Sequence, residues 1–126
     1  MDTQILAETW RGLQTLCPNI LLIGDDVGVE VNRHGMLAAL LEASRPPVYW
    51  CDGERLALPT DAIGTLVLQN PAALTPCHQR SLLEWATVHS ASQIITVARR
   101  PLYPLVQSGA FLDDLYYWLN VVTIPE

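Results

Sequence analysis

Residues 20–42, ILLIGDDVGVEVNRHGMLAALLE, contain an aliphatic run, a glycine-containing turn and the start of an amphipathic helix. The run Ile20–Ile23 has no polar residue, which is typical of a strand that is buried on both faces. The apolar face of the helix that follows consists of Met36, Leu37, Leu40 and Leu41. Open parallel sheets are built from such strand, turn and helix units. The segment therefore predicts an α/β fold.

Helix and strand patterns alternate along the rest of the chain. Further strands are predicted at Val48–Cys51, Thr65–Gln69, Gln93–Val97 and Leu119–Ile124. Helices are predicted at residues 3–16, from Thr75-Pro76 onward, and at residues 101–118 with a break at Ser108-Gly109. This alternation predicts a parallel sheet with helices on both faces. With 126 residues, half of them hydrophobic, we expect one domain that spans residues 1–126.

The turn after Ile23 has the position of a phosphate-binding loop without its sequence. Such a loop needs Gly-x-x-x-x-Gly-Lys-Ser/Thr, because its backbone amides, ammonium and hydroxyl hold the phosphates and magnesium. Counted from Gly24, Val29 takes the place of the second glycine and Glu30 that of the lysine. If Gly28 is the second glycine, Val29 stands in the lysine position. We therefore expect the glycines to form a tight turn and to bind no cofactor.

Composition excludes several classes of function. The net charge is −6 and the chain contains no lysine, so the positive surface of a DNA- or RNA-binding protein is missing. The longest apolar runs have the length of strands, which predicts no contact with a membrane and a cytoplasmic protein. Three cysteines without paired spacing favour reduced thiols.

Several segments resemble, in collinear order, the AAA+ ATPase domain of sigma-54-dependent bacterial transcription activators. Residues 111–122, FLDDLYYWLNVV, resemble the family's FREDLYYRLNVF, and residues 64–70, GTLVLQN, resemble its Walker B strand GTLFLDE. Residues 47–51, 78–83 and 94–100 resemble PFVAVNC, the LQxxLL helix and the sensor strand IIAATNR. The resemblance implies a three-layer P-loop/AAA+-like domain. Its five parallel strands would have the order 5-1-4-3-2, with Ile20–Ile23 central and no lid subdomain.

The chain departs from this family at the positions that carry its chemistry. Gln69 and Asn70 stand where the resemblance places the acids that hold magnesium and polarise water. Amides cannot act as a base, and they do not supply the anionic ligand that a hard cation prefers. Arg99 takes the place of the sensor asparagine. Leu112 and Trp118 replace the two arginines that would act across a subunit interface.

These departures predict a catalytically inactive AAA+-like domain that regulates transcription or signalling by binding protein. The partner would be an AAA+ activator or a second copy of the chain, in a homo-oligomer. The residues expected to contact it are Leu112, Trp118, Arg99 and Arg100. One alternative is nucleotide binding without hydrolysis. Another is an active ATPase module of a sigma-54-dependent transcriptional response regulator; ATP and magnesium are cofactors only in these alternatives.

Overall fold

The computed structural model describes residues 18–24 and 36–125. The helix predicted at residues 3–16, and Gly28 and Glu30 of the glycine turn, lie outside the described residues. The strands are β1 (Ile20–Ile23), β2 (Val48–Asp52), β3 (Thr65–Gln69), β4 (Gln93–Ala98) and β5 (Val122–Pro125). They form one parallel sheet with the order β2-β3-β4-β1-β5. The predicted order, with Ile20–Ile23 between the fourth and fifth strands, is confirmed.

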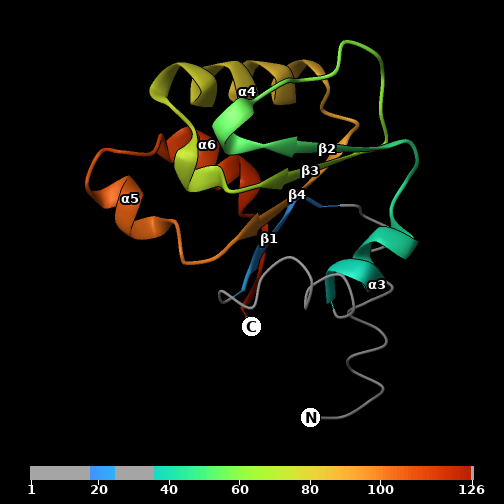
Figure 1. The fold of residues 1–126 in the computed structure, drawn as a ribbon, viewed down its shortest axis with the longest axis horizontal. Helices are drawn as coiled ribbons and strands as arrows, with labels where there is room; N and C mark the ends of the chain where they lie inside the picture. Colours follow the sequence, from blue (N-terminus) through green and yellow to red (C-terminus); the bar gives the residue numbers. More distant parts are fainter. Residues whose placement is uncertain (1–17, 25–35, 126) are drawn as a thin grey trace.

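Helices cover both faces of this sheet (Figure 1). The α-helices are α3 (Met36–Ala43), α4 (Pro76–Val88), α5 (Tyr103–Gln107) and α6 (Asp113–Leu119). Short 3-10 helices, η1 (Gly53–Arg55) and η2 (Pro71–Ala73), follow β2 and β3. Helices α4 and α6 lie on one side of the sheet and α3 lies on the other, so the described part of the chain has three layers. It contains no lid subdomain and no helix long and apolar enough to cross a membrane.

Successive side chains of a strand point to opposite faces of the sheet, so the core is divided into two clusters, one on each face. Leu66 and Leu68 of β3 belong to the cluster under α4 and α6, whereas Val67 packs with Leu37 and Leu40 of α3. All six residues of β4 are buried, as expected for a strand inside a sheet covered on both sides. The continuous aliphatic runs of the sequence are explained by this double burial.

Near the end of the chain the structure corrects one predicted boundary and confirms a predicted break in a helix. The fifth strand begins at Val122, because Leu119 is the last residue of α6 and is fully buried one turn after Leu115. An apolar residue at that helical spacing can be mistaken for the first residue of a strand. The break predicted at Ser108-Gly109 is confirmed, because the helical segment predicted at residues 101–118 consists of two helices, α5 and α6. Between them Gly109 has a φ of +81°, which a continuing helix does not permit.

Helix α4 begins as predicted. Thr75 is its cap residue, and the backbone N–H of His78 donates a hydrogen bond of 3.1 Å to the Thr75 hydroxyl. Pro76 occupies the first turn, where its missing N–H costs no hydrogen bond.

Candidate functional site

The predicted nucleotide-site positions that the structure describes meet at the carboxyl edge of the sheet. The N–H of Gly24, directly after β1, donates a hydrogen bond of 2.8 Å to the carbonyl of Ala98, the last residue of β4. Gln69 at the end of β3 pairs in register with Val97. Arg99 directly follows β4. Parallel strands end at one edge, so these residues from distant parts of the chain form one surface.

The segment after β2 lies directly against the end of β3. Asn70 has left-handed backbone angles (φ 54°, ψ 54°), and its side-chain Nδ2 lies 3.4 Å from Oε1 of Glu54. A Cβ atom on Gly53 would lie only 2.1 Å from the backbone oxygen of Asn70, so only glycine fits there. Asn70 is exposed and Gln69 is half-buried. The two side chains offer neutral amides at this edge, which can form hydrogen bonds but cannot take up a proton from water.

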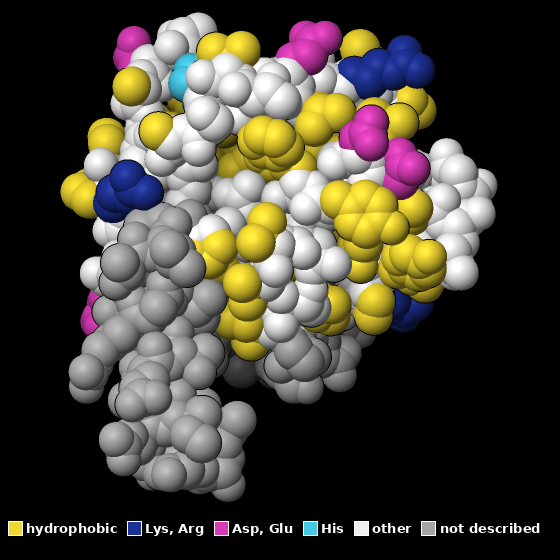
Figure 2. Space-filling model, turned by 180° about the vertical axis from the view of Figure 1, so that it is seen from behind, with side chains coloured by type: hydrophobic (Ala, Val, Ile, Leu, Met, Phe, Trp, Pro, Cys, Tyr) yellow, Lys and Arg dark blue, Asp and Glu magenta, His cyan; other side chains and the backbone are white. Residues whose placement is uncertain are grey.

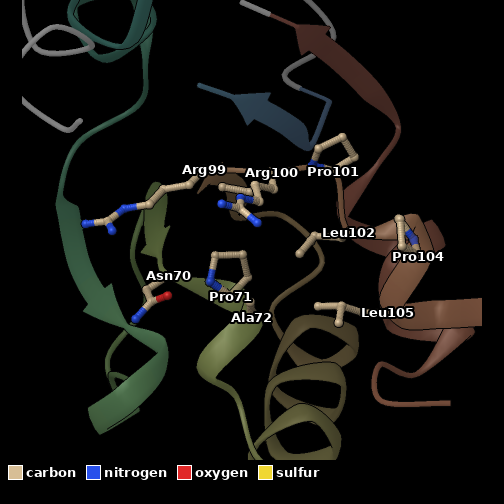
Figure 3. A pocket seen from close by; sticks show the side chains of 10 residues that line it. Asn70, Pro71, Ala72, Arg99, Arg100, Pro101, Leu102, Pro104 and Leu105 are labelled. Atoms are coloured by element: carbon tan, nitrogen blue, oxygen red, sulfur yellow. The ribbon is translucent and has the colours of Figure 1, made fainter. Parts of the chain in front are cut away.

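A cleft of about 640 Å³ opens beside Asn70, between η2 and α5. Arg99 and Arg100 line it from the end of β4, and both are exposed. Figure 3 shows the guanidinium of Arg100 directed into the space above Pro71, whereas that of Arg99 extends toward β2. The opposite walls come from η2 and from residues 101–105. The cleft therefore combines positive charge at one rim with an apolar interior.

The other two predicted contact residues, Leu112 and Trp118, lie elsewhere, on α6. Leu112 is the cap residue of this helix, and both side chains pack in part against the core cluster. Trp118 also lines a second hollow, of about 390 Å³, together with Asn19, Asp114, Tyr117 and Val121. The structure thus separates the four predicted contact residues into an arginine pair at the cleft and two partly buried residues of α6.

The most exposed hydrophobic side chains at the second hollow differ from those predicted. Tyr117 is 62% exposed and Val121 is 60% exposed, whereas Trp118 is half-buried. On the side of the molecule where α5 and α6 lie, Figure 2 shows hydrophobic side chains at the surface with acidic side chains beside them. The alternation of exposure along α6 could have been read from its helical period, because Leu115 and Leu119 mark the buried face. We call Tyr117, Trp118 and Val121 the α6 surface.

Asn19 connects the α6 surface to the sheet. Its Nδ2 donates a hydrogen bond of 3.0 Å to the Trp118 carbonyl, and its Oδ1 accepts one of 2.8 Å from the backbone N–H of Ile94. Its own carbonyl accepts from the N–H of Val122. Asn19, directly before β1, therefore connects the end of α6 to β4 through its side chain and to β5 through its backbone carbonyl. Nothing in the local sequence around Asn19 indicated this role.

The described thiols do not form a metal or nucleophile site. Cys51 is buried, and burial raises the pKa of its thiol, with the nearby Asp52 carboxylate adding to the rise. The ring of His89 stacks on Trp85, and its Nδ1 lies 3.0 Å from the Trp85 carbonyl. In residues 18–24 and 36–125, no group of three or more His, Cys, Asp and Glu side chains could hold a metal ion.

Comparisons with solved structures place this geometry in a known fold. NtrX from Brucella abortus, in complex with ATP, is similar to 97% of the chain with a TM-score of 0.69 and 16% identity. Its complex with ADP gives a TM-score of 0.65, also at 16% identity, over 99% of the chain. The chain spans 36% of the length of NtrX in both.

A second protein matches over nearly its whole length. The P-loop NTPase domain of a sigma-54 transport activator from E. coli is similar to this chain with a TM-score of 0.63 and 20% identity. The match covers 99% of this chain and 96% of that domain. No protein-family model and no curated protein matches the sequence. The structural likeness confirms the expected fold: the chain has the fold of the P-loop NTPase domain of a sigma-54 activator.

Proposed function

We propose that this chain is a non-hydrolysing AAA+-like domain that acts in transcription regulation or signalling by binding another protein in the cytoplasm. The observation that carries the proposal is the end of β3, where Gln69 and Asn70 present amides at the edge that also receives Gly24 and Arg99. Hydrolysis at such an edge requires a carboxylate to hold magnesium or orient the attacking water.

A turnover assay tests the loss of hydrolysis. The purified chain should show no magnesium-dependent release of phosphate from ATP or GTP, at low concentration or at concentrations that favour oligomers. Glu30→Lys alone should not restore turnover, because Gln69 and Asn70 still provide no anionic ligand. Asn70→Ala is the control for contaminating ATPases. Turnover that survives purification and falls in Asn70→Ala would show that the edge is catalytic, whereas a contaminant would be unaffected by the substitution.

The α6 surface is the binding surface that we propose. Two of its three residues, Tyr117 and Val121, are hydrophobic side chains that are largely exposed, and they border a hollow. Desolvation of an aromatic anchor commonly contributes about 2 kcal/mol or more to protein binding. The partner is an AAA+ activator or a second copy of this chain. Sedimentation of the chain alone, and mixed with an AAA+ activator from the source cell, separates these partners.

Two substitutions on the α6 surface test its role in association by sedimentation. Trp118→Arg should weaken association, but it should also destabilise the fold because Trp118 packs against the core. Tyr117→Glu changes the same surface at an exposed position. Val88→Asp is the matched control, since Val88 is an exposed hydrophobic residue of α4 outside the hollow. Association that is unchanged in Tyr117→Glu, with circular dichroism showing intact folding, would refute the proposed surface.

Nucleotide binding without hydrolysis is the second candidate, supported by the fold likeness to NtrX structures that contain ATP and ADP. Calorimetry with ATP and magnesium separates it from the first candidate. Stoichiometric binding without turnover would favour it, and absence of heat at millimolar nucleotide would exclude it.

A further inference from the structure

The cleft between η2 and α5 is lined by residues other than those of the α6 surface. Arg99 and Arg100 form an adjacent pair in a chain with only seven basic residues against thirteen acidic ones. Both guanidiniums are exposed, and Arg100 is directed into the cleft (Figure 3). Guanidiniums recognise carboxylates and phosphates through paired N–H donors. The rim of the cleft is thus suited to a ligand with negative charge.

Four residues that line the cleft offer no free backbone N–H to an anion. Pro71, Pro101 and Pro104 line it and have no backbone N–H. The N–H of Leu105, another lining residue, already donates to the Leu102 carbonyl at 3.0 Å. Phosphate sites usually surround the anion with several free backbone N–H groups. These four residues therefore contribute no donor to a phosphate, and they offer apolar surface to side chains beside a carboxylate.

The apolar wall is also rigid. Leu102 and Pro71 are buried, and Leu105 packs against the core cluster that includes Leu102. Proline restricts its own backbone angle, so the wall loses little conformational freedom when a ligand binds. A preformed apolar cleft with charge at its rim is suited to a short peptide in which acidic and apolar residues are adjacent.

We propose that this cleft binds an acidic, apolar segment of a protein partner, with its carboxylates on Arg100 and Arg99 and its apolar side chains against Pro101, Pro104 and Leu105. This inference rests on the proposed function, because it names the partner chemistry for a domain that acts by binding protein. It assigns the arginine pair a role separate from that of the α6 surface.

Fluorescence anisotropy with a short labelled peptide tests the proposal. The probe has two adjacent aspartates flanked by leucine and phenylalanine. One matched peptide has asparagines for the aspartates, and another has serines for the apolar residues. Arg100→Glu and Pro104→Asp place negative charge at the cleft, and Pro104→Asp does so in the first turn of α5, where an acidic residue is tolerated. Arg80→Glu, at an exposed position of α4 outside the cleft, is the control.

We expect the acidic, apolar probe to bind more tightly than either matched peptide and more weakly as salt increases. Its affinity should fall about tenfold or more in Arg100→Glu, fall in Pro104→Asp and stay unchanged in Arg80→Glu. Equal affinity for all four proteins would overturn the inference. So would the absence of saturable binding up to about 1 mM probe, which is the limit of weak specific association. The wild-type chain could also bind ATP and not the peptide. If Arg100→Glu then abolishes ATP binding, the cleft is a nucleotide site, and the inference is overturned.

Phosphate release measured on the same samples keeps this test separate from that of the proposed function. Turnover with intact peptide binding would refute the inactive domain and leave the cleft assignment standing. Absence of both turnover and peptide binding would refute only the assignment of the cleft to a peptide. The wild-type chain could instead self-associate without binding the peptide. If Arg100→Glu then abolishes the self-association, the cleft receives a second copy of the chain, and the inference as stated is overturned.

Discussion

Replacement of Gln79 should reveal how α6 is held in place. This glutamine of α4 is 2% exposed, and its side-chain amide forms three hydrogen bonds to backbone groups. Its Nε2 donates to the carbonyls of Leu74 at 3.0 Å and Ala110 at 2.9 Å, and its Oε1 accepts from the N–H of Leu112 at 2.8 Å. One side chain thus fixes the loop before α4 and the turn that leads into α6.

The magnitude follows from those three bonds. Gln79→Met keeps the length of the side chain but leaves two carbonyls and one N–H without their partner. Each buried polar group that loses its partner costs about 1–3 kcal/mol. The bonds to Ala110 and Leu112 are only partly buried, so the lower end applies, and the sum is about 3 kcal/mol. That loss is a large fraction of the roughly 5–15 kcal/mol by which a typical domain is stable.

Urea unfolding followed by circular dichroism measures this loss as a change in the free energy of unfolding. Gln79→Glu should be destabilised at neutral pH as well, because a carboxylate cannot donate to the two carbonyls. Gln107→Met, at an exposed position of α5, is the matched control and should change stability by less than about 0.5 kcal/mol. If Gln79→Met unfolds at the same urea concentration as the control, the three bonds do not hold α6 and the reasoning is refuted.

Four further predictions concern single residues in the sheet and in the helices next to it. Gly53→Ala should destabilise the chain by about 1–3 kcal/mol in the same urea assay, because its Cβ would collide with the Asn70 carbonyl; wild-type stability would contradict this. Thr96→Val should retain or gain stability, since the buried Thr96 hydroxyl has no hydrogen-bond partner among the described residues; a loss above about 1 kcal/mol would reveal a missed partner. An iodoacetamide time course should label the exposed Cys77 before Cys51, which should react only on unfolding. Burial raises the pKa of the Cys51 thiol in the folded chain. The thiol should therefore contribute its full stabilisation below the unfolded thiol pKa of about 8.5, and this contribution should decrease as pH rises toward the folded pKa. A Cys51→Ala variant whose stability depends on pH in the same way as that of the wild type would contradict this.

Sequence reasoning predicted the sheet correctly because each strand has a strong local signal. Ile20–Ile23 and Gln93–Val97 are aliphatic runs of strand length, and Thr75-Pro76 is a recognisable start of a helix. The strand order followed from the motif resemblance. The error at Leu119 arose where the local signal is ambiguous, because an apolar residue after a helix fits either a last helical turn or a first strand residue.

Part of the candidate site could also be predicted from the sequence. Gly24, Gln69, Asn70 and Arg99 each follow or end a predicted strand, and parallel strands bring such residues to one edge. The cleft could not be predicted in this way. Its walls come from η2 and α5, which have no sequence signal that pairs them. The separation of Trp118 from Arg99 and Arg100 likewise depends on how α6 packs, which residue identities alone do not specify.

The amino-acid sequence by itself determined the alternation of strands and helices and the chemistry available at the strand ends, because periodicity, caps and residue types are local properties. Only the tertiary structure decided which polar residues are structural and which are accessible. Gln79 reads as an ordinary residue of an amphipathic helix, yet its amide is buried and holds backbone segments far apart in the chain. Arg100 reads as half of a solvated pair, yet it is directed into a cleft. The physical reason is that burial and hydrogen-bond partners depend on contacts between distant segments, which form only when the layers pack.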